Sequence, residues 1–231
     1  MWSIIYGAMI KGLPYDDPQS IVAVFRTNPS RNIDRMGVTV QDFADWQKDQ
    51  KSFSQRGAFT CATFNVSGRD AKAERFDGCW MTSDAMAIPR VPSARGRLFQ
   101  PTDDKPGAER VAMIGHSMWQ NRYGADANIV GKPIRVNGQP YTIIGVMPAG
   151  FLYPQNTQIW AQLTIDPLAT LRRDAPQYQV VGRIKPTSNL DEANVDLDRI
   201  MQRIESENKE TNEGVRALVQ PYVKAFMGPE P

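Results

Sequence analysis

The sequence has little of the side-chain chemistry from which most active sites are built. It holds one histidine and two cysteines in 231 residues. The cysteines form no C-x-x-C motif and match no zinc-ligand spacing. His116 has no nucleophile and orienting partner beside it in the sequence, so a capping or surface position is favoured over a general base. We therefore predict no catalytic, metal-binding or cofactor-binding residue, and no cofactor.

Long apolar runs are also missing. No run approaches the roughly 20 apolar residues that a membrane-crossing helix needs. The opening run, Ile4 to Ile10, is broken by Gly7 and lacks the basic region and cleavage site of a signal peptide. The residues leave two interpretations of this run open: a buried first strand or helix, or the outer end of a membrane helix.

Neither sign of charge dominates. The 27 basic and 25 acidic residues give a net charge of +2 and are interspersed along the chain. Binding of nucleic acid usually requires a concentrated basic face, so we predict no nucleic-acid partner. A hydrophobic content of 41% with 23% charged residues is typical of a globular protein, and the length suffices for one large domain or two smaller ones.

What the sequence does contain is a strong β-hairpin signal near its centre. Asn137-Gly138 separates two apolar runs, KPIRV and PYTIIGV, and is the residue pair that a type I′ turn prefers. Before the hairpin we predict a strand in RVAMI and a short helix in MWQNRY, capped by Ser117 or His116 and ended by Gly124. After it, IWAQL is predicted to be a strand. This central block is thus predicted to be a small, hairpin-rich β unit.

The flanking segments predict strands and helices in alternation. Ile21 to Thr27 is a short β-branched run typical of a buried strand, and Thr39 can cap a helix through VQDFADWQKDQ. Near the other end, YQVVGRI and RALVQPY are predicted strands on either side of a helix that Asn189 caps and that carries a one-sided apolar stripe. Because these halves flank a β-rich insertion, the first and last segments are expected to share one sheet.

The two cysteines lie in two predicted strands, AFTCATFNVSG and AERFDGCWMT. If this hairpin folds symmetrically about Asp70, Phe64 lies opposite Phe76 and Cys61 lies opposite Cys79. The two cysteines could then be joined in a disulfide, or could remain buried thiols that pack as small apolar groups. Both interpretations remain open on the sequence.

The segment from Ser83 to Asp104 is predicted to be a loop, because it is rich in proline and carries three arginines: Arg90, Arg95 and Arg97. The step Arg95-Gly96-Arg97 could hold a phosphate. Such a step is more often a turn with solvated or ion-paired arginines, and we favour that interpretation.

Several stretches of the chain together carry a family resemblance: FADWQKDQKSF, GRLFQPTDD, VAMIGHSMWQNRYGADANIVGKPIRVNGQPYTIIGVMPAGF and IWAQL. They resemble the MacB-like periplasmic core domain, in the version found in acidobacterial-type predicted permeases of ABC transporters. The resemblance spans nearly the whole chain, and the opening GAMIKGLPYDDPQSIVAVF is similar to the segment that leaves the first membrane helix. The most specific part of the resemblance is an ordered set of residues: Trp119, Gly124, Ile129-Val130-Gly131, Asn137-Gly138 and Ile144 to Pro148.

The resemblance implies an α+β fold, with a porter-like βαβ subdomain and an inserted small β-rich subdomain. Residues 1–15 are then a membrane-helix stump and the segment that leads from it. Residues 16–107 and 170–231 form the porter-like subdomain, and residues 108–169 form the insertion. The stretch SDAMAIPRVPSARGRLF departs from the family pattern, since Met86 and the following residues replace an aromatic residue and a Leu-Gly step. The resemblance therefore does not predict the family's local helix before Arg97.

The resemblance also implies a non-enzymatic domain on the periplasmic side of a bacterial inner membrane, between the first and second membrane helices of an integral membrane protein. Such a domain would transmit ATPase-driven conformational change to partners or cargo. The expected partners are the membrane helices of its own full-length permease, a cytoplasmic ABC ATPase acting indirectly, and a second permease protomer or a periplasmic partner. The chain lacks a G-x-x-x-x-G-K-[ST] phosphate loop, which fits an ATPase located elsewhere.

Two other functional classes are weighed beside this one. The first is a periplasmic binding module that holds a lipid, a peptide or a small export substrate between the two subdomains. The second is a hydrolase, for which His116 would have to be the base. The absence of a companion nucleophile in the sequence favours the binding module over the hydrolase.

Overall fold

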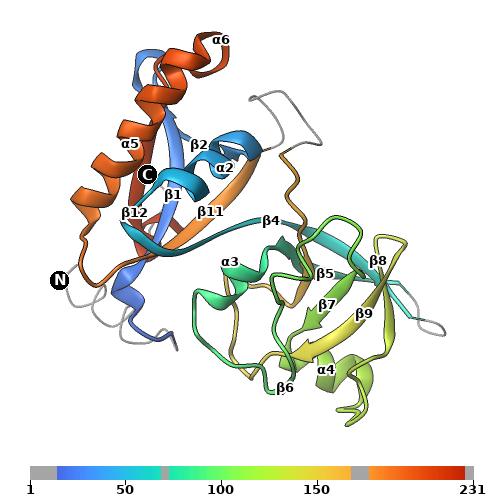
Figure 1. Ribbon diagram of the computed structural model, residues 1–231. Helices are drawn as coiled ribbons and strands as arrows, with labels where there is room; N and C mark the ends of the chain where they lie inside the picture. Colours follow the sequence, from blue (N-terminus) through green and yellow to red (C-terminus); the bar gives the residue numbers. More distant parts are fainter. Residues whose placement is uncertain (1–14, 69–72, 168–176, 227–231) are drawn as a thin grey trace. The chain divides into compact units, whose positions relative to one another are not determined.

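The computed structural model of the protein describes residues 15–68, 73–167 and 177–226 (Figure 1). These residues divide into two compact units: unit 2 comprises residues 59–165, and unit 1 comprises the described residues on either side of it. Helices and strands are mixed along the chain, so the predicted α+β class is confirmed. No helix within the described ranges is long and apolar enough to span a membrane. The apolar run from Ile4 to Ile10 lies outside them.

Unit 1 has six principal elements, in the chain order strand, helix, strand, strand, helix, strand: β1 (Ile21–Asn28), α2 (Val40–Asp49), β4 (Phe53–Ser67), β11 (Gln177–Ile184), α5 (Leu190–Glu207) and β12 (Arg216–Pro221). Its strands lie in the order β12–β1–β11–β4, and β1 pairs antiparallel with both β11 and β12. This is the split βαβ arrangement. The expected sharing of one sheet by the first and last segments is confirmed. The shorter elements are η1 (Pro18–Ser20), η2 (Pro29–Arg31), β2 (Ile33–Met36), β3 (Val38–Thr39), α6 (Lys209–Asn212) and α7 (Tyr222–Phe226).

The two long helices of unit 1 begin where the sequence predicts. The Thr39 hydroxyl accepts a hydrogen bond from the Asp42 amide at 3.3 Å, and the Asn189 side chain accepts one from the Glu192 amide at 2.9 Å. Each bond satisfies an amide that the first helical turn leaves without a partner. The apolar stripe of α5 is buried and lies next to α2, where the Trp46 indole N–H points at the Met201 sulfur at 3.3 Å. The helices therefore pack as one layer.

A buried ion pair and the hydrogen bonds around it link three elements of unit 1. The Arg26 guanidinium on β1 donates to the Asp42 carboxylate on α2 at 2.9 Å, and these side chains are 4% and 0% exposed. Arg26 also donates to the Gly37 carbonyl at 2.8 Å, and the Asn212 amide of α6 donates to Asp42 at 3.3 Å. The sequence predicts only the helix on which Asp42 lies. The structure adds a network that holds β1, α2 and α6 together.

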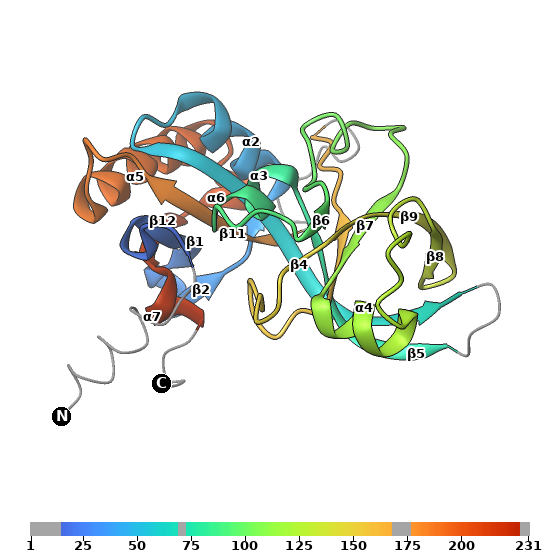
Figure 2. The same ribbon diagram turned by 90° about the horizontal axis from the view of Figure 1, so that it is seen from below.

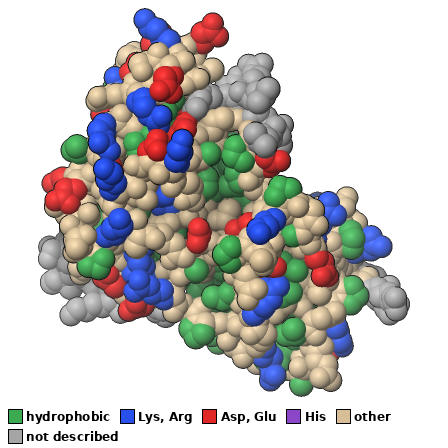
Figure 3. Space-filling view, viewed as in Figure 1, with side chains coloured by type: hydrophobic (Ala, Val, Ile, Leu, Met, Phe, Trp, Pro, Cys, Tyr) green, Lys and Arg blue, Asp and Glu red, His purple; other side chains and the backbone are tan. Residues whose placement is uncertain are grey.

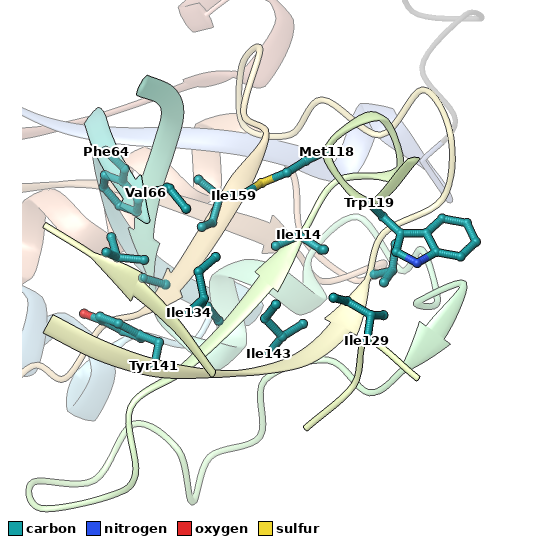
Figure 4. Close-up of a cluster of buried hydrophobic side chains, with 14 residues drawn as sticks. Phe64, Val66, Ile114, Met118, Trp119, Ile129, Ile134, Tyr141, Ile143 and Ile159 are labelled. Atoms are coloured by element: carbon teal, nitrogen blue, oxygen red, sulfur yellow. The ribbon is translucent and has the colours of Figure 1, made fainter. Parts of the chain in front are cut away.

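Unit 2 is a sheet that closes on itself. Besides the second half of β4, it contains β5 (Glu74–Met81), α3 (Ser83–Ala87), β6 (Arg95–Gly96), β7 (Val111–Ile114), α4 (His116–Tyr123), β8 (Pro133–Val136), β9 (Gln139–Val146) and β10 (Ile159–Gln162). The strands pair in the order β4–β5–β10–β7–β9–β8, and β8 pairs in turn with β4. Figure 4 shows the apolar cluster that these strands and α4 bury, including Phe64, Ile114, Ile134 and Ile159.

The predicted hairpin closes this ring. Val136 pairs with Gln139, so the turn has two residues, and both take positive φ angles: 49° at Asn137 and 81° at Gly138. These angles are the ones that favour Asn-Gly in a type I′ turn. The Asn137 side chain accepts a hydrogen bond from the Asn65 amide at 2.8 Å, and the Asn137 amide donates to the Asn65 carbonyl at 2.8 Å. The turn residue thus fastens the hairpin to β4.

The expected pairing of the cysteine-bearing strands is confirmed. In the β4–β5 pair, Phe64 lies opposite Phe76 and Cys61 lies opposite Cys79. Cys61 and Cys79 are joined in a disulfide with a Cα–Cα distance of 4.0 Å, which resolves the alternative that the sequence leaves open. The disulfide links adjacent strands of the ring.

The division of the chain differs from the expected one over residues 59–107, which belong to unit 2, and at residues 166–167, which belong to unit 1. The cause is pairing between strands that are distant in sequence. β5 pairs in parallel with β10, and the end of β4 pairs with β8. These pairings bring the first hairpin into the same unit as the central block.

Two local predictions are wrong. The segment after Thr82 begins with the short helix α3 rather than a loop, because the Thr82 hydroxyl caps it by accepting from the Ala85 amide at 3.3 Å. The cap of α4 is Gly115, and neither His116 nor Ser117, since the helix already begins at His116. The predicted end of α4 at Gly124 is confirmed, with a φ of 58°.

Candidate functional site

The residues that the sequence offers as possible catalytic or phosphate-binding groups pack against, or form ion pairs with, neighbouring side chains. The His116 ring packs against the Trp119 ring at a centroid distance of 5.4 Å. Arg97 forms an ion pair with Asp103 at 2.6 Å, which confirms the ion-paired interpretation, and the Arg95 guanidinium lies 4.8 Å from the Trp119 ring centroid. Burial alone would raise the pKa of Asp103, but hydrogen bonds from Arg97 and the Gln100 amide lower it. No group of three or more His, Cys, Asp or Glu that could hold a metal ion occurs in the described ranges.

The first and last described segments of the chain meet at one place in unit 1. We call this place the terminal joint: Tyr15, Asp16, Asp17, Arg183 and the α7 residues Tyr222 and Phe226. The Tyr15 and Tyr222 rings meet edge to face at 6.4 Å, and burial raises the pKa of the Tyr15 hydroxyl. Figure 2 shows α7 beside β1, where the Phe226 ring lies 6.1 Å from the Phe25 ring. Both ends of the described chain are therefore packed onto unit 1.

Arg183 is the polar centre of the joint. Its guanidinium, on β11 and 2% exposed, donates to the Asp16 carbonyl at 2.7 Å and the Asp17 carbonyl at 3.0 Å. It also donates to the Ser20 hydroxyl at 2.6 Å, and the Asp17 carboxylate lies 3.7 Å away. Asp17 bends the chain with a φ of 44°. Arg183 thus holds the segment that precedes β1 through hydrogen bonds to two backbone carbonyls of that segment.

The sequence does not reveal this role. Arg183 lies in YQVVGRI, where a strand is correctly predicted, and it stands as a charged residue at the end of an apolar run. A buried charge needs partners, so its presence in a strand buried on both faces is the available signal. The identity of those partners is set by β11 pairing with β1, which places Arg183 opposite Ile21, and is not visible in the sequence.

On the face shown in Figure 3, basic and acidic side chains lie interspersed over both units. This distribution agrees with the interspersed charges in the sequence. We take the terminal joint as the candidate functional site because of its buried arginine and its packed aromatic rings.

Three solved structures share this fold. A domain from Porphyromonas gingivalis, assigned to a permease protein, has 15% identity and a TM-score of 0.67, over 90% of this chain and 92% of that one. The extracellular domain of the noncanonical ABC-type transporter YknZ from Gram-positive bacteria has 15% identity and a TM-score of 0.61, over 86% and 99%. The periplasmic region of MacB from Actinobacillus actinomycetemcomitans has 12% identity and a TM-score of 0.64, over 97% and 99%. The fold is thus that of extracytoplasmic domains of ABC-type permeases.

The family itself is shown by the sequence match. Residues 7–200 match the MacB-like periplasmic core domain, and the chain belongs to this family. It is the periplasmic domain of an ABC transporter permease, a class of protein that has membrane helices and works with an ATPase. No curated protein sequence gives a match to the chain.

Proposed function

We propose that the chain is a non-enzymatic domain that transmits ATPase-driven movement of the permease's membrane helices to partners or cargo. The observation that carries the proposal is the terminal joint, in which one buried arginine grips the segment preceding β1. A cytoplasmic ABC ATPase would act on the domain indirectly, through those helices. The receiving partner would be a second permease protomer or a periplasmic protein.

The joint can transmit displacement because it has several attachments to the sheet. Arg183 holds the chain just before β1, and β1 itself is hydrogen-bonded to β11 and β12 on its two sides. On the other side of the joint, Tyr222 follows β12 directly and packs against Tyr15. A displacement of the segment before β1 or of the segment after β12 is therefore transmitted to three paired strands: β1, β11 and β12. The Arg26–Asp42 network adds α2 to the same rigid body.

Replacing Arg183 with methionine is expected to lower the free energy of unfolding by about 1.5–3 kcal/mol, the typical contribution of hydrogen bonds donated by a charged group. The Asp17 carbonyl keeps its hydrogen bonds from the Ser20 amide and hydroxyl, which limits the loss. Urea denaturation measures the effect. Arg199→Met is the matched control, since its side chain is 64% exposed and forms an ion pair with Asp196 one helical turn away. Equal stability of both variants would mean that Arg183 is not the anchor.

The functional test uses the full-length permease reconstituted with its ATPase. Coupling between two sites is reciprocal, so loosening the joint should change how strongly the domain's partners alter nucleotide affinity. We expect Arg183→Met to reduce the coupling and Arg199→Met to leave it unchanged. The same coupling in both variants would contradict the proposal.

The alternative function is a binding module for a lipid, peptide or small export substrate. Unit 2 contains a cavity of about 840 Å³, within the size range of ligand sites. Charged and amide side chains, including Glu109, Arg110 and Gln162, line it beside the aromatic ones. This lining disfavours a lipid.

A further inference from the structure

We propose that the cavity in unit 2 is a binding site for a neutral saccharide. The cavity lies where the strands of the closed sheet end, among Trp80 of β5, the segment 106–110 before β7, residues 140–142 of β9 and residues 162–164 at the end of β10. All these residues belong to unit 2. The inference is independent of the mechanical role proposed for unit 1.

Two aromatic side chains line the cavity. Trp80 is held in place by the Phe64 ring at a centroid distance of 4.3 Å, and Tyr141 is 9% exposed and belongs to the apolar cluster of unit 2. Figure 4 shows the Tyr141 hydroxyl pointing away from that cluster. Neither this hydroxyl nor the Trp80 indole N–H makes a hydrogen bond with the described part of the chain. The half-buried Trp80 ring and the hydroxyl of the largely buried Tyr141 suit a ligand that has an apolar C–H face and polar edges, as a sugar ring has.

The polar groups around these two rings offer both donors and acceptors. The Glu109 carboxylate accepts from the Thr142 hydroxyl at 2.5 Å, which fixes its position and leaves further acceptor capacity. Gln162 is 8% exposed and donates to the Thr164 hydroxyl at 2.5 Å, and its oxygen remains an acceptor. Arg110 is exposed, and its side chain makes no hydrogen bond or ion pair with the described residues. Sugar hydroxyls both donate and accept, so they can use all of these groups.

The balance of charge in the cavity selects a neutral ligand. The lining contains one carboxylate, Glu109, and one guanidinium, Arg110, and so carries no net charge that would attract a charged ligand. Pro106, Pro133 and Pro140 lie around the cavity and fix the backbone there.

Saturation-transfer difference NMR tests the site with the 231-residue chain and three probes: triacetylchitotriose, maltotriose and a proline-rich decapeptide. We expect saturation transfer from the protein to the ring C–H protons of at least one trisaccharide, with millimolar or tighter affinity. A preference for triacetylchitotriose would indicate a structural glycan of the cell envelope as the source, and a preference for maltotriose would indicate a soluble oligosaccharide. Binding of the peptide alone, or of no probe, would overturn the proposal.

Two variants assign any binding to the cavity. Arg110→Ala removes an exposed side chain and should weaken trisaccharide binding about tenfold, the effect of one lost charge-assisted hydrogen bond. Trp80→Leu removes the indole from the cavity while retaining an apolar side chain, and should abolish transfer to the ring protons. Arg75→Ala, an exposed arginine on the same strand as Trp80, is the matched control and should bind as the unmodified chain does. Equal weakening by Arg75→Ala and Arg110→Ala would place the binding elsewhere and contradict the assignment.

Discussion

Replacing Asp42 with alanine is expected to lower the free energy of unfolding by about 3–5 kcal/mol, because it leaves the Arg26 guanidinium buried without its counter-charge. Arg26 is 4% exposed and would keep only its hydrogen bond to the Gly37 carbonyl among the contacts described above. The Asn212 amide, which is fully buried, would lose its acceptor as well. Urea denaturation followed by circular dichroism measures the loss.

Two controls separate the ion pair from other effects of the substitution. Asp191→Ala removes an exposed carboxylate from the first turn of α5, and should cost at most about 1 kcal/mol from the lost interaction with the helix dipole. The double variant Arg26→Met/Asp42→Leu should recover much of the stability, since it replaces both charges with apolar groups. An Asp42→Ala variant no less stable than Asp191→Ala would show that Asp42 acts only on the helix dipole.

Reducing the Cys61–Cys79 disulfide is expected to lower the free energy of unfolding by about 3 kcal/mol. The bond closes a loop with a sequence separation of 18, and a loop of this size restricts the unfolded chain by about that amount. A periplasmic location supports the bond, because that compartment is oxidising. The measurement compares urea denaturation of the chain with and without a thiol reductant.

The control for this prediction is the Cys61→Ser/Cys79→Ser variant. Its stability should equal that of the reduced chain and should not respond to the reductant. Mass spectrometry after alkylation provides an independent check: without prior reduction, no alkyl group should be added to the unmodified chain. Addition of two alkyl groups before reduction would mean that the cysteines are free thiols.

The sequence predicts most of the elements because their signals are local. Thr39 and Asn189 carry their helix-capping groups beside the helices that they start, and Asn137-Gly138 carries its turn preference within two residues. The register of the cysteine strands follows from like residues in symmetric positions. The missed α3 also has a local signal, a capping hydroxyl at Thr82, which the surrounding prolines obscured.

The features that the sequence does not reveal depend on strand pairing across long separations. Residues 59–107 belong to unit 2 because β5 pairs with β10 and β4 pairs with β8, and no local pattern encodes those pairings. The terminal joint depends in the same way on β11 lying beside β1. The sequence shows that Arg183 is charged. Only the folded chain shows that the carbonyls of Asp16 and Asp17 surround it.

The central claim is that movement of the membrane helices reaches the domain through the terminal joint. Hydrogen exchange of the full-length permease with its ATPase tests it most directly, compared between the nucleotide-free state and a state trapped with ATP. The account predicts that exchange changes with nucleotide in peptides covering residues 15–28 and 216–226, and that Arg183→Met confines the change to residues before Ile21. Identical exchange throughout the domain in the two nucleotide states would contradict the account.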